Sequence, residues 1–172
     1  MESEQLTIGQ ALKFARHDFL NELQLMLLYM DLGKPAEARK SLLDATERMR
    51  NLSKLENLRM PQTEVWLNTY EWRHPSFSKT LHCAAIPGDR AADDKAVSSY
   101  LERLIEAVEK VLDPMEDYTI DTVIEATAQQ WSIQLTIRGL LAGIPVIDPV
   151  HTGFEVGTTM QDEQWTFTIS GR

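Results

Sequence analysis

The chain has 172 residues, of which 43% are apolar and 25% are charged, a balance that is typical of a folded globular protein and excludes a disordered one. A single cysteine, Cys83, excludes an internal disulfide and fits a reducing compartment. The sequence shows no secretory signal and no apolar run of about 18 residues, the length that a membrane span needs. We therefore expect a cytoplasmic protein.

Charge is distributed unevenly along the chain. Residues 1–60 carry nine basic and nine acidic side chains, whereas residues 61–172 carry eight basic and seventeen acidic ones, so the net charge of −9 belongs to the second part. An acidic surface disfavours binding to nucleic acid. The change in charge balance predicts two domains, residues 1–60 and residues 61–172.

The first domain is predicted to be an antiparallel helical hairpin. Apolar residues recur in steps of three or four, as on one face of a helix. In the first helix these are Ile8, Leu12, Ala15, Phe19, Leu23, Met26 and Met30, and in the second they are Ala38, Leu42, Ala45, Met49, Leu52 and Leu55. Between them, Gly33 is typical of a helix end and Pro35 of a helix start. We expect the second helix to end between Leu58 and Pro61.

The first helix is apolar over a wider arc than a two-helix hairpin can bury, because Leu20, Leu25, Leu27 and Leu28 lie outside the first series. The second domain could cover this excess, or a second copy of the hairpin could. We favour a homodimer in which two hairpins form a four-helix bundle.

The second domain is predicted to be α+β. Alternating or β-rich segments indicate strands, and one long segment has helical periodicity and stops at Asp113-Pro114. The helix spans residues 93–112, and the strands span residues 76–84, 118–127, 131–139, 154–160 and 164–170. Polar turns are expected at residues 128–130 and 161–163, and an irregular loop at residues 143–153.

The segment FARHDFLNELQ, residues 14–24, places a histidine in the middle of the first helix. His17 lies about 200° around the helix from Ala15 and Phe19, so we expect it to point away from the hairpin seam, with Lys13, Asn21 and Gln24 on its own face. A neutral imidazole is a good nucleophile near neutral pH. An ordinary solvated histidine would have the same placement.

The neighbours of His17 suit phosphoryl transfer, which needs in-line positioning and compensation of charge. Lys13 and Arg16 would offset the charge of a phosphoryl group, and Asp18 would help to orient the ring. Asn21 and Gln24 would hold phosphate oxygens or the backbone of a partner. Magnesium is expected to come from the partner's carboxylates, because this face offers few of its own.

The stretch RHDFLNELQL, residues 16–25, resembles the phosphoacceptor motif, roughly R-H-D-x-x-N-x-L-Q, of the sporulation initiation phosphotransferase B family. The resemblance continues through SKLENL, residues 53–58, and the aromatic segment from Trp66 to Trp72; the rest of the chain is similar in layout and length. It implies a four-helix-bundle dimer and a degenerate kinase-like second domain. It also implies that a phosphoryl group passes from the aspartate of one response regulator through His17 to that of another. The motif neighbours are Arg16, Asp18, Asn21 and Gln24.

Similar motifs occur in sensor histidine kinases, so the motif alone does not decide between a kinase and a phosphotransferase. The second domain decides between these two activities. An ATP site needs an Asn-bearing helix for magnesium and two Gly-rich segments. The helix at residues 100–110 has no Asn, and nothing in the chain reads D-x-G-x-G or G-x-G-x-G. We therefore expect no bound cofactor, no ATP and an ATP-independent phosphotransferase. A non-catalytic regulator-binding module and an active kinase are the alternatives.

Other candidate sites are weaker. His74, His82 and His151 lack metal-ligand spacing, so no metal site is expected. The His17-Asp18 pair is similar to that of metal-dependent phosphohydrolases, but the hairpin offers no further ligands. Cys83 is expected to be packed in a strand.

Overall fold

The computed structural model describes residues 6–141, 143, 145–147, 153–161 and 164–172. It contains α1 (Ile8–Asp31), α2 (Pro35–Lys54), a short 3-10 helix η1 (Leu55–Leu58), α3 (Pro61–Arg73) and α4 (Asp94–Glu109). The strands are β1 (Phe77–Ala85), β2 (Tyr118–Ala126), β3 (Trp131–Arg138), β4 (Glu155–Gln161) and β5 (Gln164–Gly171). The predicted α+β class is confirmed, and each predicted strand lies within about one residue of an observed one.

The hairpin of α1 and α2 forms where the sequence provides helix ends. Thr7 and Gln10 form a reciprocal capping box at the start of α1, which satisfies amide groups that have no partner within the helix. Gly33 adopts a positive φ of 66°, which glycine accepts without strain, and Pro35 is the first residue of α2. The predicted turn is therefore confirmed.

The predicted seam of the hairpin is wrong for most of α1. No residue of α1 is buried, and the predicted series is largely exposed, with Phe19 at 54% and Met30 at 59%. The partly buried positions form a neighbouring stripe: Ala11, Phe14, Glu22, Met26 and Tyr29. Among the first four residues of the predicted α2 series, Ala38 and Ala45 are buried, while Leu42 and Met49 are exposed. Periodicity identified the apolar arc of α1. The part of this arc that faces α2 depends on where the short side chains Ala38 and Ala45 let α1 approach.

Helix α3 was not predicted. Helix α2 passes into η1, and the chain then turns at Arg59, a non-glycine residue with φ of 55° and ψ of 35°. Pro61 follows as the first residue of α3. A proline ends one helix but also suits the first turn of the next. The sequence therefore indicated where the second helix ends but not that a further helix begins at Pro61.

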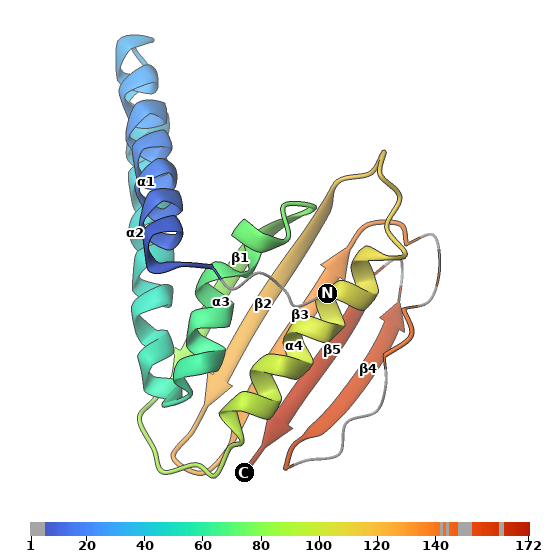
Figure 1. The fold of residues 1–172 in the computed structure, drawn as a ribbon. Helices are drawn as coiled ribbons and strands as arrows, with labels where there is room; N and C mark the ends of the chain where they lie inside the picture. Colours follow the sequence, from blue (N-terminus) through green and yellow to red (C-terminus); the bar gives the residue numbers. More distant parts are fainter. Residues whose placement is uncertain (1–5, 142, 144, 148–152, 162–163) are drawn as a thin grey trace. The chain divides into compact units, whose positions relative to one another are not determined.

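The five strands form one mixed sheet in the order β1-β2-β3-β5-β4. β1 pairs with β2 in parallel, and the other pairs are antiparallel. Helices α3 and α4 lie on one face of this sheet, as Figure 1 shows. The predicted turn at residues 128–130 joins β2 to β3, whereas residues 162–163 and most of the predicted loop at residues 143–153 lie outside the described part.

One face of the sheet forms the core and the other is polar. Buried and less buried residues alternate along β3 and along β5 as far as Ser170, as expected for a sheet with one covered face. From α4, the chief core residues are Val97, Leu101, Leu104, Ile105 and Val108. Asp93 caps α4 through the Ala96 amide, and Cys83 is buried in this core, as predicted.

The chain forms two compact units, residues Met1–Arg50 and Asn51–Arg172, and the division falls inside α2. The first unit is the helical hairpin without the last turn of α2. The second contains η1, α3, α4 and the sheet. No helix among the described residues combines the length and the apolar character that crossing a membrane requires.

Candidate functional site

His17 lies in the middle of α1 and is strongly exposed, with 70% of its side chain accessible. By helical geometry it lies about 120° around α1 from the partly buried stripe that faces α2. The imidazole is therefore open to a second protein. This agrees with the predicted outward direction, although the stripe that faces α2 differs from the predicted one.

Two neighbouring side chains hold the same ring nitrogen of His17. Nδ1 lies 3.5 Å from Oδ1 of Asp18 and 3.2 Å from the side-chain amide of Asn21, one turn further along the helix. Within the described residues, no hydrogen bond reaches Nε2. A ring that donates its Nδ1 proton to Asp18 has an unprotonated Nε2, which is the form that can act as a nucleophile. The Asn21 Nδ2, by contrast, can donate only to an unprotonated Nδ1, so the two contacts favour opposite tautomers of the ring.

The other predicted site residues surround His17 without contacting it. Lys13, Arg16 and Gln24 are exposed on the helix, and the described structure places none of them within hydrogen-bond distance of the imidazole. Long, exposed side chains of this kind are free to reach toward an incoming anion. The geometry thus divides the predicted set into two residues that hold the ring and three that stand around it.

Sequence reasoning did not predict the ion pair between Glu22 of α1 and Arg48 of α2. The Glu22 side chain is 24% exposed and lies five residues after His17. The pair joins the two helices of the hairpin close to the histidine. A carboxylate within an otherwise apolar stripe was the available signal, but its partner depends on the register between the helices.

A second cluster of charges was also missed. At the α3–α4 contact, Glu102 accepts hydrogen bonds from Trp66 and Arg73, both at 2.6 Å, and its Oε2 lies 3.5 Å from Nε2 of His74. Nδ1 of His74 lies 3.0 Å from Glu109.

Burial lowers the pKa of His74, but the two carboxylates outweigh it and raise that pKa to about 9. Burial raises the pKa of Glu102, but His74, Trp66 and Arg73 lower it to about 2. The cluster locks α3 to α4.

The end of β3 packs tightly against the end of α4. Gly139 has a φ of 134°, and a Cβ there would lie 2.5 Å from the Tyr118 ring, so this position requires glycine. The Tyr118 hydroxyl donates to the Leu140 carbonyl at 2.5 Å and accepts from the Asp113 amide at 2.9 Å. Leu112 and Leu141 form a β-bridge beside it. The segment after β3 is thus fastened to the segment after α4.

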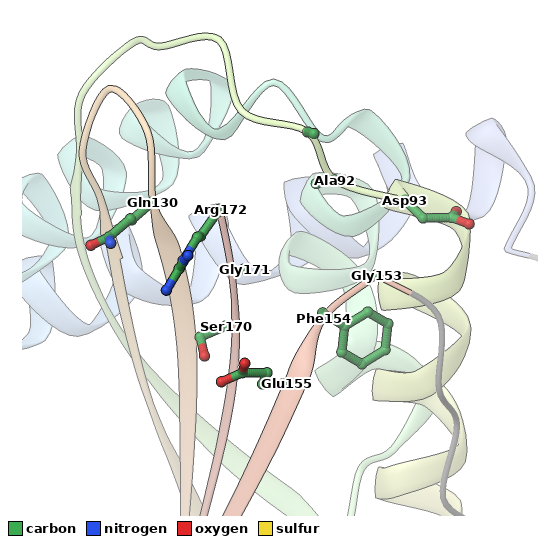
Figure 2. A pocket seen from close by; sticks show the side chains of 10 residues that line it. Ala92, Asp93, Gln130, Gly153, Phe154, Glu155, Ser170, Gly171 and Arg172 are labelled. Atoms are coloured by element: carbon green, nitrogen blue, oxygen red, sulfur yellow. The ribbon is translucent and has the colours of Figure 1, made fainter.

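An open cavity of about 1030 Å³ lies at the other end of the sheet, beside the start of α4. Figure 2 shows side chains from the ends of β4 and β5 in this cavity, among them Glu155, Ser170 and Arg172. Its lining carries charges of both signs and no histidine. The cavity therefore offers no histidine that could act as a nucleophile in place of His17.

Metal ligation has no support in the described part of the chain. No group of three or more His, Cys, Asp or Glu side chains comes together there in a way that could hold a metal ion. His74 is occupied by its two carboxylate partners. His151 lies outside the described residues.

Comparison with known families and structures gives one family match and several structural similarities. Residues 1–58 match the alpha-helical domain of the SpoOB-type sensor kinases. No curated protein matches the chain. The fold is similar to the Acinetobacter baumannii histidine kinase AdeS, at 16% identity and a TM-score of 0.45, covering 90% of this chain and 96% of that one.

Two further structures involve the histidine kinase ThkA. Its catalytic domain is 14% identical, with a TM-score of 0.41, covering 66% of this chain and 90% of that one. ThkA in complex with the response regulator protein TrrA is 12% identical, with a TM-score of 0.39, covering 95% of this chain and 61% of that one.

By this match the helical part is similar to a domain of sensor kinases. The match covers residues 1–58, about a third of the chain, and agrees with the family resemblance of the motif around His17.

Proposed function

We propose that the chain is a phosphorelay histidine phosphotransferase. It accepts a phosphoryl group on His17 from the aspartyl phosphate of one response regulator and delivers the group to the aspartate of a second. The observation that carries this proposal is the state of His17: the ring is exposed, the Asp18 carboxylate lies beside Nδ1, where it can hold the proton of the tautomer with a nucleophilic Nε2, and no hydrogen bond among the described residues reaches Nε2. The SpoOB-type match of residues 1–58 supports it.

The chemistry balances without a further reactant. The Nε2 lone pair attacks the phosphorus of the aspartyl phosphate, the bond between phosphorus and the aspartate oxygen breaks, and the aspartate leaves as a carboxylate. The ring then carries a positive charge, which the Asp18 carboxylate at 3.5 Å offsets. The second regulator's carboxylate attacks the same phosphorus, and His17 returns to its neutral form.

Lys13, Arg16 and Gln24 are proposed to act on the phosphoryl oxygens and the regulator surface. Lysine and arginine offset phosphate charge most strongly where the docked partner excludes water. Magnesium would be supplied by the regulator, since the described residues form no metal site of their own. The proposed partners are therefore response regulators in the cytoplasm.

The hairpin is proposed to dimerise into a four-helix bundle. The series that was expected to face α2 remains exposed, and on α2 the exposed Leu42 and Met49 are one heptad apart. The midline of the α1 series lies about 160° around the helix from His17. A second hairpin that covers this series would bury the apolar side chains and leave the imidazole accessible.

Transfer is proposed to be independent of ATP. Helix α4 carries no Asn, and the second unit has no D-x-G-x-G or G-x-G-x-G segment of the kind that nucleotide binding needs. The second unit would then serve as a rigid support and as part of the docking surface.

A phosphotransfer assay tests the proposal. A response regulator whose aspartate has been phosphorylated with labelled acetyl phosphate is mixed with the wild-type chain, then with a second, unphosphorylated regulator. We expect acid-labile label on the wild-type chain and then on the second regulator. His17→Ala should abolish both steps, whereas His82→Ala, which removes an exposed histidine of β1, should leave them unchanged.

Three results would contradict the proposed phosphotransferase function or the role of His17 in it. No label on the wild-type chain, with regulator binding retained, would indicate a non-catalytic regulator-binding module. Label on the His17→Ala variant would exclude His17 as the acceptor. Label from ATP alone would indicate an active kinase.

A further inference from the structure

Strand β4 is an exposed edge of the sheet. Among the described residues it pairs with β5 alone, and all seven of its residues are exposed along the sequence Glu155-Val156-Gly157-Thr158-Thr159-Met160-Gln161. Figure 1 shows β4 at the opposite edge of the sheet from β1. The strand contains no lysine and no proline, the residues that most often prevent an edge from pairing with another chain. No other described segment pairs with its outer backbone groups, which are available to a further strand.

The other edge is covered. The Asn51 side chain accepts a hydrogen bond from the Cys83 amide at 3.1 Å, and the Asn57 side chain donates to the Ala85 carbonyl at 3.1 Å. These contacts occupy backbone groups of β1 that a further strand would need. The protein thus protects one edge with side chains from the end of α2 and from η1, and leaves the other edge open.

We propose that β4 pairs with β4 of a second copy, antiparallel and across a two-fold axis through Thr158. Residues that oppose each other in a sheet point to the same face, so both members of each pair must be odd-numbered or both even-numbered. The axis therefore passes through a residue. Only an axis through Thr158, the middle of the strand, gives every residue of β4 a partner.

The side chains of β4 are complementary to themselves in this register. Val156 opposes Met160, so the two apolar residues meet, and they share the covered face with Ile169 and Trp165 of β5. Thr158 opposes its own copy, a pairing that strands favour. Glu155, the only charged residue of the strand, opposes the neutral Gln161, so no like charges are brought together.

The contact is small and the copies repel each other. A pair of seven-residue strands buries far less surface than a stable dimer does, and each chain carries a net charge of −9. The association is therefore weak, and it strengthens with protein concentration and with salt, which screens the repulsion. It is separate from the proposed bundle dimer, and together the two contacts would give species larger than a dimer.

Single cysteines at two adjacent threonines of the full chain test the register. In Thr158→Cys the two Cα atoms would be about 5 Å apart, within the range that a disulfide bridges. In Thr159→Cys they would be about 8 Å apart, beyond it. We expect about tenfold more disulfide-linked dimer from Thr158→Cys under mild oxidation, and a loss of that excess when Met160→Lys is added. Cys83 is buried and common to all variants.

Equal cross-linking of the two variants, or none from Thr158→Cys, would overturn the proposal. Amide hydrogen exchange provides a second measurement on the wild-type chain. Exchange in residues 155–161 should slow as protein concentration rises, whereas exchange that is independent of concentration would also overturn the proposal. Slowing only when a response regulator is added would assign the edge to that partner instead. None of these results depends on phosphorylation of His17.

Discussion

The side-chain amide of Asn21 lies 3.2 Å from Nδ1 of His17, one helical turn away. Asn21 contacts Nδ1 and restrains the orientation of the ring, although its Nδ2 donates only when Nδ1 is unprotonated. Through the loss of this restraint, Asn21→Ala should slow phosphoryl transfer through His17 by about tenfold, the effect of one lost hydrogen bond. Regulator affinity should change little. Single-turnover transfer rates measure the first effect, and titration calorimetry measures the second.

Gln24→Ala is the matched control, because Gln24 shares the His17 face but does not contact the ring. The ¹⁵N chemical shifts of His17 provide a readout that is independent of activity, since they report which nitrogen carries the proton. Asn21→Ala should alter the tautomer ratio and Gln24→Ala should not. An unchanged rate and ratio in Asn21→Ala would exclude a positioning role.

Phe19 and Leu28 are about equally exposed, at 54% and 52%, but lie on different faces of α1. Phe19 belongs to the series proposed to meet a second hairpin, while Leu28 lies on the His17 side. Phe19→Glu should convert the dimer to a monomer, because it would place a charge within an apolar bundle core. Sedimentation equilibrium at micromolar concentration measures this.

Leu28→Glu should leave the dimer intact and weaken regulator binding instead. A wild-type chain that sediments as a monomer under these conditions would contradict the proposed bundle. So would dissociation of the dimer by Leu28→Glu but not by Phe19→Glu.

His74 should make stability depend on pH. Its pKa is about 9 in the folded chain and about 6.5 when unfolded, so the charged form stabilises the fold fully below about pH 6.5. This contribution, about 3 kcal/mol at most, is lost as the pH rises through 9. The difference in unfolding free energy between wild type and His74→Asn should therefore shrink from about pH 6 to about pH 10. Urea denaturation at several pH values measures it.

Glu102 does not complicate this comparison, because its pKa of about 2 keeps it ionised throughout that range. His82→Asn controls for the loss of a histidine, since His82 is exposed on β1. Glu109→Gln should reduce the pH dependence, because it removes the carboxylate 3.0 Å from Nδ1 of His74. A pH-independent difference between wild type and His74→Asn would show that His74 is neutral in the fold.

Asp94 of α4 caps the start of α3. Its carboxylate accepts from the amides of Gln62 at 2.7 Å and Thr63 at 2.8 Å, while Met60 makes no side-chain cap of its own. Asp94→Ala should lower the unfolding free energy by about 1–2 kcal/mol. Asp89→Ala removes the same charge from a 98% exposed side chain and should cost less than about 1 kcal/mol. Equal losses in urea denaturation would argue against the cap.

The sequence alone determined the features that depend on local order. Helix and strand periodicity located the hairpin, α4 and all five strands, and Gly33 with Pro35 marked the hairpin turn. The same periodicity placed His17 away from the apolar series, and the motif around it indicated the family of residues 1–58. These features follow from residues within a few turns of one another, so spacing is enough to predict them.

Only the tertiary structure decided which surfaces meet. The stripe of α1 that faces α2, the pairing of Glu22 with Arg48, and the His74 cluster depend on the register between separate helices. Spacing allowed contact between His17 and Asn21, but the observed rotamers brought both Asn21 and Asp18 to Nδ1. Sheet order likewise placed β1 and β4 at the two edges, because strand neighbours are chosen by contacts between distant segments, which no local pattern encodes.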